Sequence, residues 1–163
     1  MKKNYNSQQA SAIIEKHSPA VYRLALSYTK NKSDAEDIMQ EVFLRYIKKE
    51  RQFDSDEHER AWFLRVTSNC AKTHFARRRT TVDLDEIGEL AAEPRENEEV
   101  SVLDAVMRLP EKQRVCVHLF YYEDLPIASI GETLAMPEST VKSHLHRARA
   151  ALKEMLKGAF FDE

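Results

Sequence analysis

The sequence has few residues that interrupt helices and no stretch that suits a membrane span. It contains three glycines and five prolines in 163 residues, too few for a fold built from many short strands and turns. No apolar run is long enough to cross a bilayer as a helix. The Lys2-Lys3 pair is not followed by an apolar core or a small-residue cleavage site, so we expect no signal peptide. These absences predict a helical, cytoplasmic protein.

Catalytic and metal-binding patterns are also missing from the sequence. There is no glycine-rich phosphate loop, no Cys-x-x-Cys and no His-Glu-x-x-His. Cys70 and Cys116 lie far apart in helical patterns, which favours buried free thiols over a disulfide or a metal pair. His144 and His146 are two residues apart, diverge on a helix and cannot share a metal. We therefore expect neither an enzyme nor a bound cofactor.

The charged residues divide the chain into three parts. They make up 32% of the sequence, and the net charge is only −2. No acid lies between Arg60 and Arg79, whereas Arg95 is the one basic residue in an acidic stretch that Gly88 and Pro94 interrupt. We interpret residues 1–79 and 100–163 as two small helical domains and residues 80–99 as an acidic linker.

The strongest local pattern lies in the second domain and predicts two helices joined by a tight turn. Ile127, Ile130 and Leu134 have helical spacing, and a second apolar stripe begins with Val141 after a break at 135–137. This is the outline of a helix-turn-helix. The second helix turns small polar and basic residues outward, which suits base edges and phosphates; they are Ser139, Lys142, Ser143, His146, Arg147 and Arg149. The alternative is an ordinary solvated helix, and charge alone leaves both open.

Three helices are expected in the first domain. The first spans Ser7 to Lys16, and Ser18-Pro19 restarts it. Ser33 and Glu36 form a capping box for the second, on which Asp37, Gln40, Glu41 and Leu44 share a mixed polar face. That face is either an acidic first turn favoured by the helix dipole or a contact surface for a basic partner helix. The residues alone favour the first.

The third helix, from Asp56 to about Arg79, is cationic along its length. Its basic residues suit a phosphate backbone; they are Arg60, Arg65, Lys72, Arg77, Arg78 and Arg79. The helix dipole accounts for the last turn only. Trp62 is expected in the core, with stacking on a base as the alternative.

Five segments, in this order, resemble the extracytoplasmic-function sigma factors of bacterial RNA polymerase, of the sigma-70 family. They are DAEDIMQEVF at 34–43, AWFLRV at 61–66 followed by Asn69, LPEK at 109–112, TVKS at 140–143 and LHRAR at 145–149. The resemblance implies an all-α fold of two small helical domains joined by a flexible acidic linker, the C-terminal domain being a helix-turn-helix. It implies promoter recognition and transcription initiation, with core polymerase, promoter DNA and an anti-sigma factor, soluble or membrane-anchored, as partners.

The resemblance also assigns expected roles to residues. Contact with the clamp helices of core polymerase is implied for Asp34, Asp37, Gln40, Glu41 and Leu44, so the solvated interpretation of that face becomes the weaker one. Binding of the −10 element is implied for Phe53, Trp62, Arg65, Asn69, Lys72, Arg77, Arg78 and Arg79, with Asn69 and the Phe53 loop reading an unpaired base. Binding of the −35 element is implied for Ser139, Thr140, Lys142, Ser143, His146, Arg147 and Arg149. The second domain would also meet the β flap of the polymerase.

Several positions depart from the family pattern and leave the promoter sequence open. Thr73 stands where Asp or Asn is frequent, and Ala76 replaces a frequent basic residue. His144 replaces a frequent arginine. Ala135 stands where glycine is usual in the turn, which implies mild strain if its φ is positive. The alternatives are a stand-alone helix-turn-helix regulator and a helical protein–protein adaptor.

Overall fold

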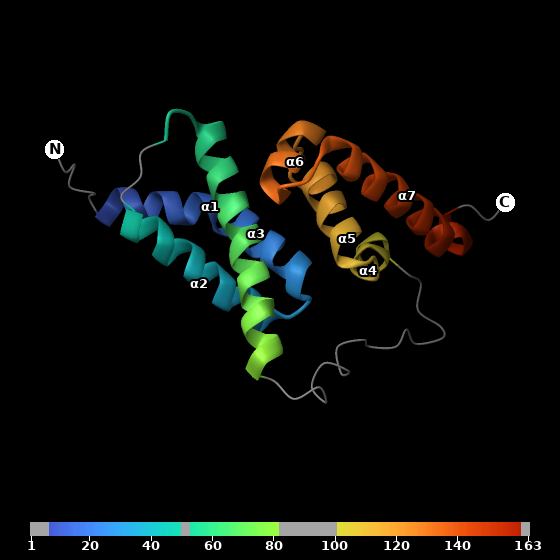
Figure 1. The fold of residues 1–163 in the computed structure, drawn as a ribbon, viewed down its shortest axis with the longest axis horizontal. Helices are drawn as coiled ribbons and strands as arrows, with labels where there is room; N and C mark the ends of the chain where they lie inside the picture. Colours follow the sequence, from blue (N-terminus) through green and yellow to red (C-terminus); the bar gives the residue numbers. More distant parts are fainter. Residues whose placement is uncertain (1–6, 50–52, 82–100, 161–163) are drawn as a thin grey trace.

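The computed structural model describes residues 7–49, 53–81 and 101–160, and all regular structure within these ranges is helical. The elements are α1 (Ser7–Thr29), α2 (Lys32–Lys49), α3 (Asp56–Thr81), α4 (Val102–Met107), α5 (Glu111–Val117), the π-helical turn η2 (His118–Tyr122), α6 (Ile127–Leu134) and α7 (Glu138–Phe160). Figure 1 shows α1–α3 as one group and α4–α7 as another. The prediction of an all-α fold with two helical domains is confirmed. Residues 82–99 of the predicted linker lie outside the described ranges.

The first group is held together by an apolar and aromatic core. Val21 and Leu24 of α1, Ile38 and Val42 of α2, and Phe63 of α3 are almost completely buried. The predicted restart at Ser18-Pro19 is wrong, because α1 continues through Pro19. The apolar stripe extends on both sides of the proline and packs against α2 and α3, so packing outweighs the lost N–H donor.

Polar side chains begin the next two helices. Asn31 Oδ1 accepts from the Asp34 N–H at 3.0 Å, so Asn31, rather than Ser33, satisfies the first turn of α2. Ser55 Oγ accepts from the His58 N–H at 3.1 Å at the start of α3.

The second group contains the predicted helix-turn-helix, formed by α6 and α7. Ile130, Leu134, Val141 and Leu145 are buried between the helices. Ala135 ends α6 in the left-handed conformation, with φ 55° and ψ 48°, and the next N–H, of Met136, donates to the Gly131 carbonyl at 2.9 Å. The positive φ considered for Ala135 is therefore present.

The two domains pack against each other. Helix α5 contacts α1, and α6 contacts α3, so the buried apolar residues of both groups form a continuous cluster. In the described parts of the chain, no helix is long and apolar enough to span a bilayer.

Candidate polymerase and nucleic-acid interface

The predicted polymerase-binding residues all lie on α2. Asp37, Gln40 and Leu44 are exposed, and Leu44 is 49% exposed. Asp34 and Glu41 are partly buried; Asp34 pairs with His74 at 3.1 Å and Glu41 with Arg45 at 3.1 Å. The α2 face therefore combines the exposed Asp37 carboxylate and Gln40 amide with an exposed apolar residue.

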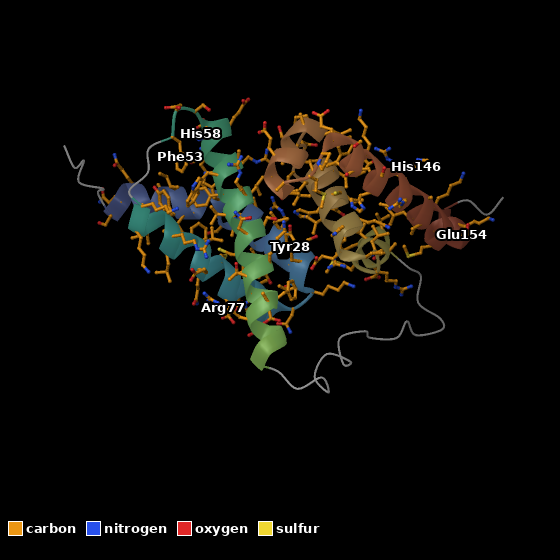
Figure 2. All side chains as sticks on the ribbon, in the orientation of Figure 1. Tyr28, Phe53, His58, Arg77, His146 and Glu154 are labelled. Atoms are coloured by element: carbon orange, nitrogen blue, oxygen red, sulfur yellow. The ribbon has the colours of Figure 1, made fainter. Side chains whose placement is uncertain are left out.

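An aromatic cluster lies at the beginning of α3. The half-buried Phe53 ring packs 5.7 Å from Trp62 and 6.5 Å from Tyr46, and meets His58 edge-on at 5.5 Å. Figure 2 shows Phe53 and His58 together at this end of the first domain. Trp62 is only 7% exposed, so its expected place in the core is confirmed. Its role in DNA binding stays a prediction.

The basic helix α3 presents its polar residues along the outside. Arg65, Asn69, Lys72 and Arg77 are exposed, and the first three follow one another at helical intervals of four and three residues. The Lys72 ammonium group lies 3.5 Å from the Leu134 carbonyl oxygen of the second domain. Arg78 and Arg79 belong to α3, but their side chains lie outside the described part.

Four of the predicted −35 residues gather at one place on α7. Lys142, Ser143, His146 and Arg147 are exposed and line a shallow hollow. Figure 2 shows His146 on α7, in the domain opposite the one that carries Phe53 and Arg77. Ser139 is exposed and Thr140 half-buried in the first turn of the same helix.

Two residues of α7 have environments that the helical pattern did not predict. The guanidinium of Arg149 donates to the Tyr121 hydroxyl at 2.7 Å and lies over the Phe120 and Tyr121 rings. Burial, followed by the charges of Arg147 and Lys112, lowers the pKa of His144 below its usual value of 6.5. His144 is therefore neutral at pH 7 and does not replace the charge of an arginine.

A buried carboxylate joins the two domains. Glu123, directly after η2, has a side chain only 2% exposed; one of its oxygens lies 3.1 Å from His118 Nε2, and it pairs with Arg23 of α1 at 3.1 Å and Arg60 of α3 at 3.1 Å. Burial raises the pKa of this carboxyl group. The hydrogen bonds from His118 and Arg60 and the charge of Arg23 outweigh burial and lower it to about 2.

Arg114 makes a second contact between the domains. This side chain of α5 is 4% exposed and donates to the carbonyl of Ser27, to that of Tyr28 at 3.2 Å and to that of Leu109 at 2.7 Å. Ser27 and Tyr28 are in the last turn of α1, where carbonyls lack partners within the helix. A cation is favoured there by the helix dipole, so the second domain completes the end of α1. Figure 2 shows Tyr28 between the two helical groups.

Sequence reasoning missed Arg23, Arg114 and Glu123. Arg60 was noticed only as part of a cationic helix. Each pairs with a residue at least 63 positions away in the sequence across the domain contact, and no local spacing predicts such pairs. The one local hint in the sequence was Glu123, an acidic residue directly after the aromatic residues 120–122.

The geometry defines a class of protein. In the described ranges, no group of three or more histidine, cysteine or acidic residues is placed to hold a metal ion. A helix-turn-helix with a cationic outer face stands beside a helical domain that carries a basic helix and an acidic helix face. These are the features of a two-domain helical protein of the helix-turn-helix class.

Comparisons with known proteins identify the family. Residues 13–81 match the family model described as Sigma-70 region 2, and residues 99–152 match Sigma-70, region 4. The chain is 31% identical over 157 residues to the ECF RNA polymerase sigma factor SigL of Mycobacterium tuberculosis, covering 90% of this chain and 88% of the relative. It is 28% identical over 163 residues to the ECF RNA polymerase sigma factor SigW of Bacillus subtilis, covering 89% and 87%. The chain belongs to the extracytoplasmic-function sigma factors, which direct RNA polymerase to promoters.

A solved structure supports the fold. The sigma factor RpoE of Bartonella quintana, solved in complex with the anti-sigma factor NepR, superposes with a TM-score of 0.71 at 22% identity, covering 94% of this chain and 97% of that one.

Proposed function

We propose that this sigma factor joins core polymerase through the α2 face and binds promoter DNA through both domains. Asp34, Asp37, Gln40, Glu41 and Leu44 contact the polymerase clamp. Arg65, Asn69, Lys72 and Arg77–Arg79 hold the melted −10 strand. The aromatic cluster around Phe53 forms one wall of a pocket for an unpaired base, with Trp62 supporting it from the core.

In the second domain, α7 enters the major groove of the −35 element. The observation that carries the proposal is the hollow lined by Lys142, Ser143, His146 and Arg147 on a helix-turn-helix. Side chains of these types combine hydrogen bonding to base edges with phosphate contacts. Ser139, Thr140 and Arg149 lie on the same helix, and Arg149 reaches the DNA backbone once it leaves its aromatic partners.

Regulation and location follow from the family. An anti-sigma factor holds the protein inactive by covering these surfaces, as the NepR complex of a protein with the same fold suggests. The protein acts in the cytoplasm, by binding rather than by catalysis.

Run-off transcription with core polymerase and a promoter mapped in the source bacterium tests the proposal. The purified protein should add promoter-dependent transcripts, because initiation requires both domains. Asp37→Arg should abolish these transcripts by weakening core binding, and should leave binding of −35 duplex DNA unchanged. Failure of the wild-type protein to start transcription would reject the function. Equal core affinity of the variant would reject the role of α2.

A further inference from the structure

The contact between the domains has the geometry of an anion site. Arg23 approaches the Glu123 carboxylate with two nitrogens, Nε at 3.2 Å from Oε1 and Nη2 at 3.4 Å from Oε2. Arg60 Nη2 lies 3.1 Å from Oε2 and also donates to the Glu123 main-chain carbonyl. Two guanidinium groups from different helices of the first domain thus converge on a single pair of oxygens of the second.

The two partners differ in how they would respond if the domains separated. Glu123 is 2% exposed, whereas the side chains of Arg23 and Arg60 are 49% and 37% exposed. The two arginines therefore remain partly exposed on the surface of the first domain while the Glu123 carboxylate binds them. Without the second domain, both guanidinium groups would keep their charge and lose the partner that holds them together.

The first domain has little to replace Glu123. No acid follows Arg60 in α3 up to Arg79. Asp56 and Glu59, in the first turn, already pair with Lys16 at 3.3 Å and His17 at 2.5 Å. Glu57 lies three residues before Arg60, but an exposed pair at that spacing is weak. An oxyanion from outside the domain is the natural alternative.

Phosphodiesters match this site in charge and shape. Converging guanidinium groups bind the oxygens of a phosphate with the same two-pronged geometry that they use for a carboxylate. Arg60 lies five residues before Arg65 on the basic helix α3, so the site lies on the same helix as the surface proposed for the −10 strand.

We propose that Arg23 and Arg60 form a binding site for a phosphate of the DNA backbone, and that Glu123 occupies this site when the domains are packed together. This inference rests on the proposed function, because it extends the DNA surface of the first domain. Domain packing and DNA binding then compete for the same two guanidinium groups. Separation of the domains is a condition for full contact with DNA.

Binding of a fluorescein-labelled single-stranded DNA 12-mer to the full chain, followed by anisotropy over a range of salt concentrations, tests the site. Glu123→Gln should bind several-fold more tightly than wild type, because it releases both arginines. The slope of log K against log salt should steepen by roughly 0.7 for each phosphate gained. The triple variant Glu123→Gln/Arg23→Ala/Arg60→Ala should lose both effects, although its domains are equally released.

Glu132→Gln provides the matched control, since it removes one negative charge from an exposed position on α6 of the same domain. Its affinity should stay close to wild type. A triple variant that keeps the tighter binding would overturn the proposal, because release of the domains would then act without the arginines. Wild-type affinity of a folded Glu123→Gln would also overturn it.

A variant that leaves Glu123 intact tests the two arginines directly. Arg23→Ala/Arg60→Ala changes two partly exposed side chains, and its salt slope should be shallower than that of Glu123→Gln by roughly 0.7 per lost phosphate contact. A slope equal to that of Glu123→Gln would reject the site. If wild-type protein still supports run-off transcription in that case, only this inference fails and the proposed function stands.

Discussion

Glu123 shows how one side chain can hold two domains together. A buried carboxylate is unfavourable unless ionic and hydrogen-bonding partners compensate for lost hydration. Here His118 of its own domain and two arginines of the other supply them. Glu123→Gln removes the charge and releases the arginines without leaving an unpaired buried anion, so the folded structure of each domain should be preserved.

The depressed pKa of Glu123 predicts a specific loss of stability in acid. The pKa falls from 4.5 to about 2 on folding, so the charged group stabilises the folded state above about pH 5, and this stabilisation disappears as the pH falls towards 2. The shift corresponds to at most about 3 kcal/mol before solvent screening at the partly exposed arginines. The difference in unfolding free energy between wild type and Glu123→Gln should narrow by about 2 kcal/mol between about pH 5 and about pH 3.

Urea denaturation at several pH values measures this difference, and subtraction of the variant removes the contribution of the other carboxylates. A difference in unfolding free energy that stays constant with pH would show that the contacts of Glu123 do not lower its pKa in the folded protein.

At the scale of elements, the helix-turn-helix depends on one residue in an unfavourable backbone conformation. Ala135 has a φ of 55°, where the Cβ of an L-residue is crowded and glycine is not. Gly131, one turn earlier, cannot be exchanged in the same way, because a Cβ there would lie 2.8 Å from the Met136 carbonyl oxygen. The turn thus has a glycine where a side chain would clash and an alanine where glycine would suit.

Ala135→Gly should therefore stabilise the protein by about 0.5–1 kcal/mol, the relief of the left-handed alanine less the greater freedom of glycine in the unfolded chain. Ala150→Gly is the control, since Ala150 is exposed within α7; it should destabilise by about 1 kcal/mol. Urea midpoints measure both. Equal destabilisation by the two substitutions would contradict the strain at Ala135.

Periodicity and turn residues predicted the main elements, because these depend on neighbours in the sequence. The stripe from Val141 to Ala148 predicted α7 correctly, and the break at 135–137 predicted the turn. Pro19 and Ser33 led to wrong predictions of where helices begin, for different reasons. Core packing on both sides overrides the proline, and Asn31 lies closer to the actual start of α2. Phe53 and Asn69 became candidates for DNA binding through the family resemblance, since nothing in their spacing alone implies DNA.

At the scale of the whole molecule, Arg114 and Glu123 hold the two domains in one body. Neither contact can be predicted from local sequence patterns. Arg114 lies 87 residues from its partner Ser27, and Glu123 lies 100 residues from its partner Arg23. The sequence therefore predicted two domains but not their arrangement. Burial lowers the pKa of Arg114, but carbonyl groups at the end of α1 still favour a cation there.

Arg114→Ala should separate the domains in solution. Small-angle X-ray scattering of the wild-type protein should give a radius of gyration near the roughly 15 Å expected for a compact chain of this length. The variant should give a larger radius with unchanged helical circular dichroism. Arg108→Ala, at an exposed position after α4, should match the wild type. A compact Arg114→Ala would show that Glu123 and the apolar contacts suffice.

The completion of α1 by a residue of the second domain has a consequence during synthesis. The first domain is finished at Thr81, whereas Arg114 and Glu123 are added later. At about 5–20 residues per second, the 42 residues between 81 and 123 take about 2–8 s. For that interval every new molecule has the last carbonyls of α1 open and the guanidinium groups of Arg23 and Arg60 uncovered. Each nascent chain therefore passes through an open stage before it can close.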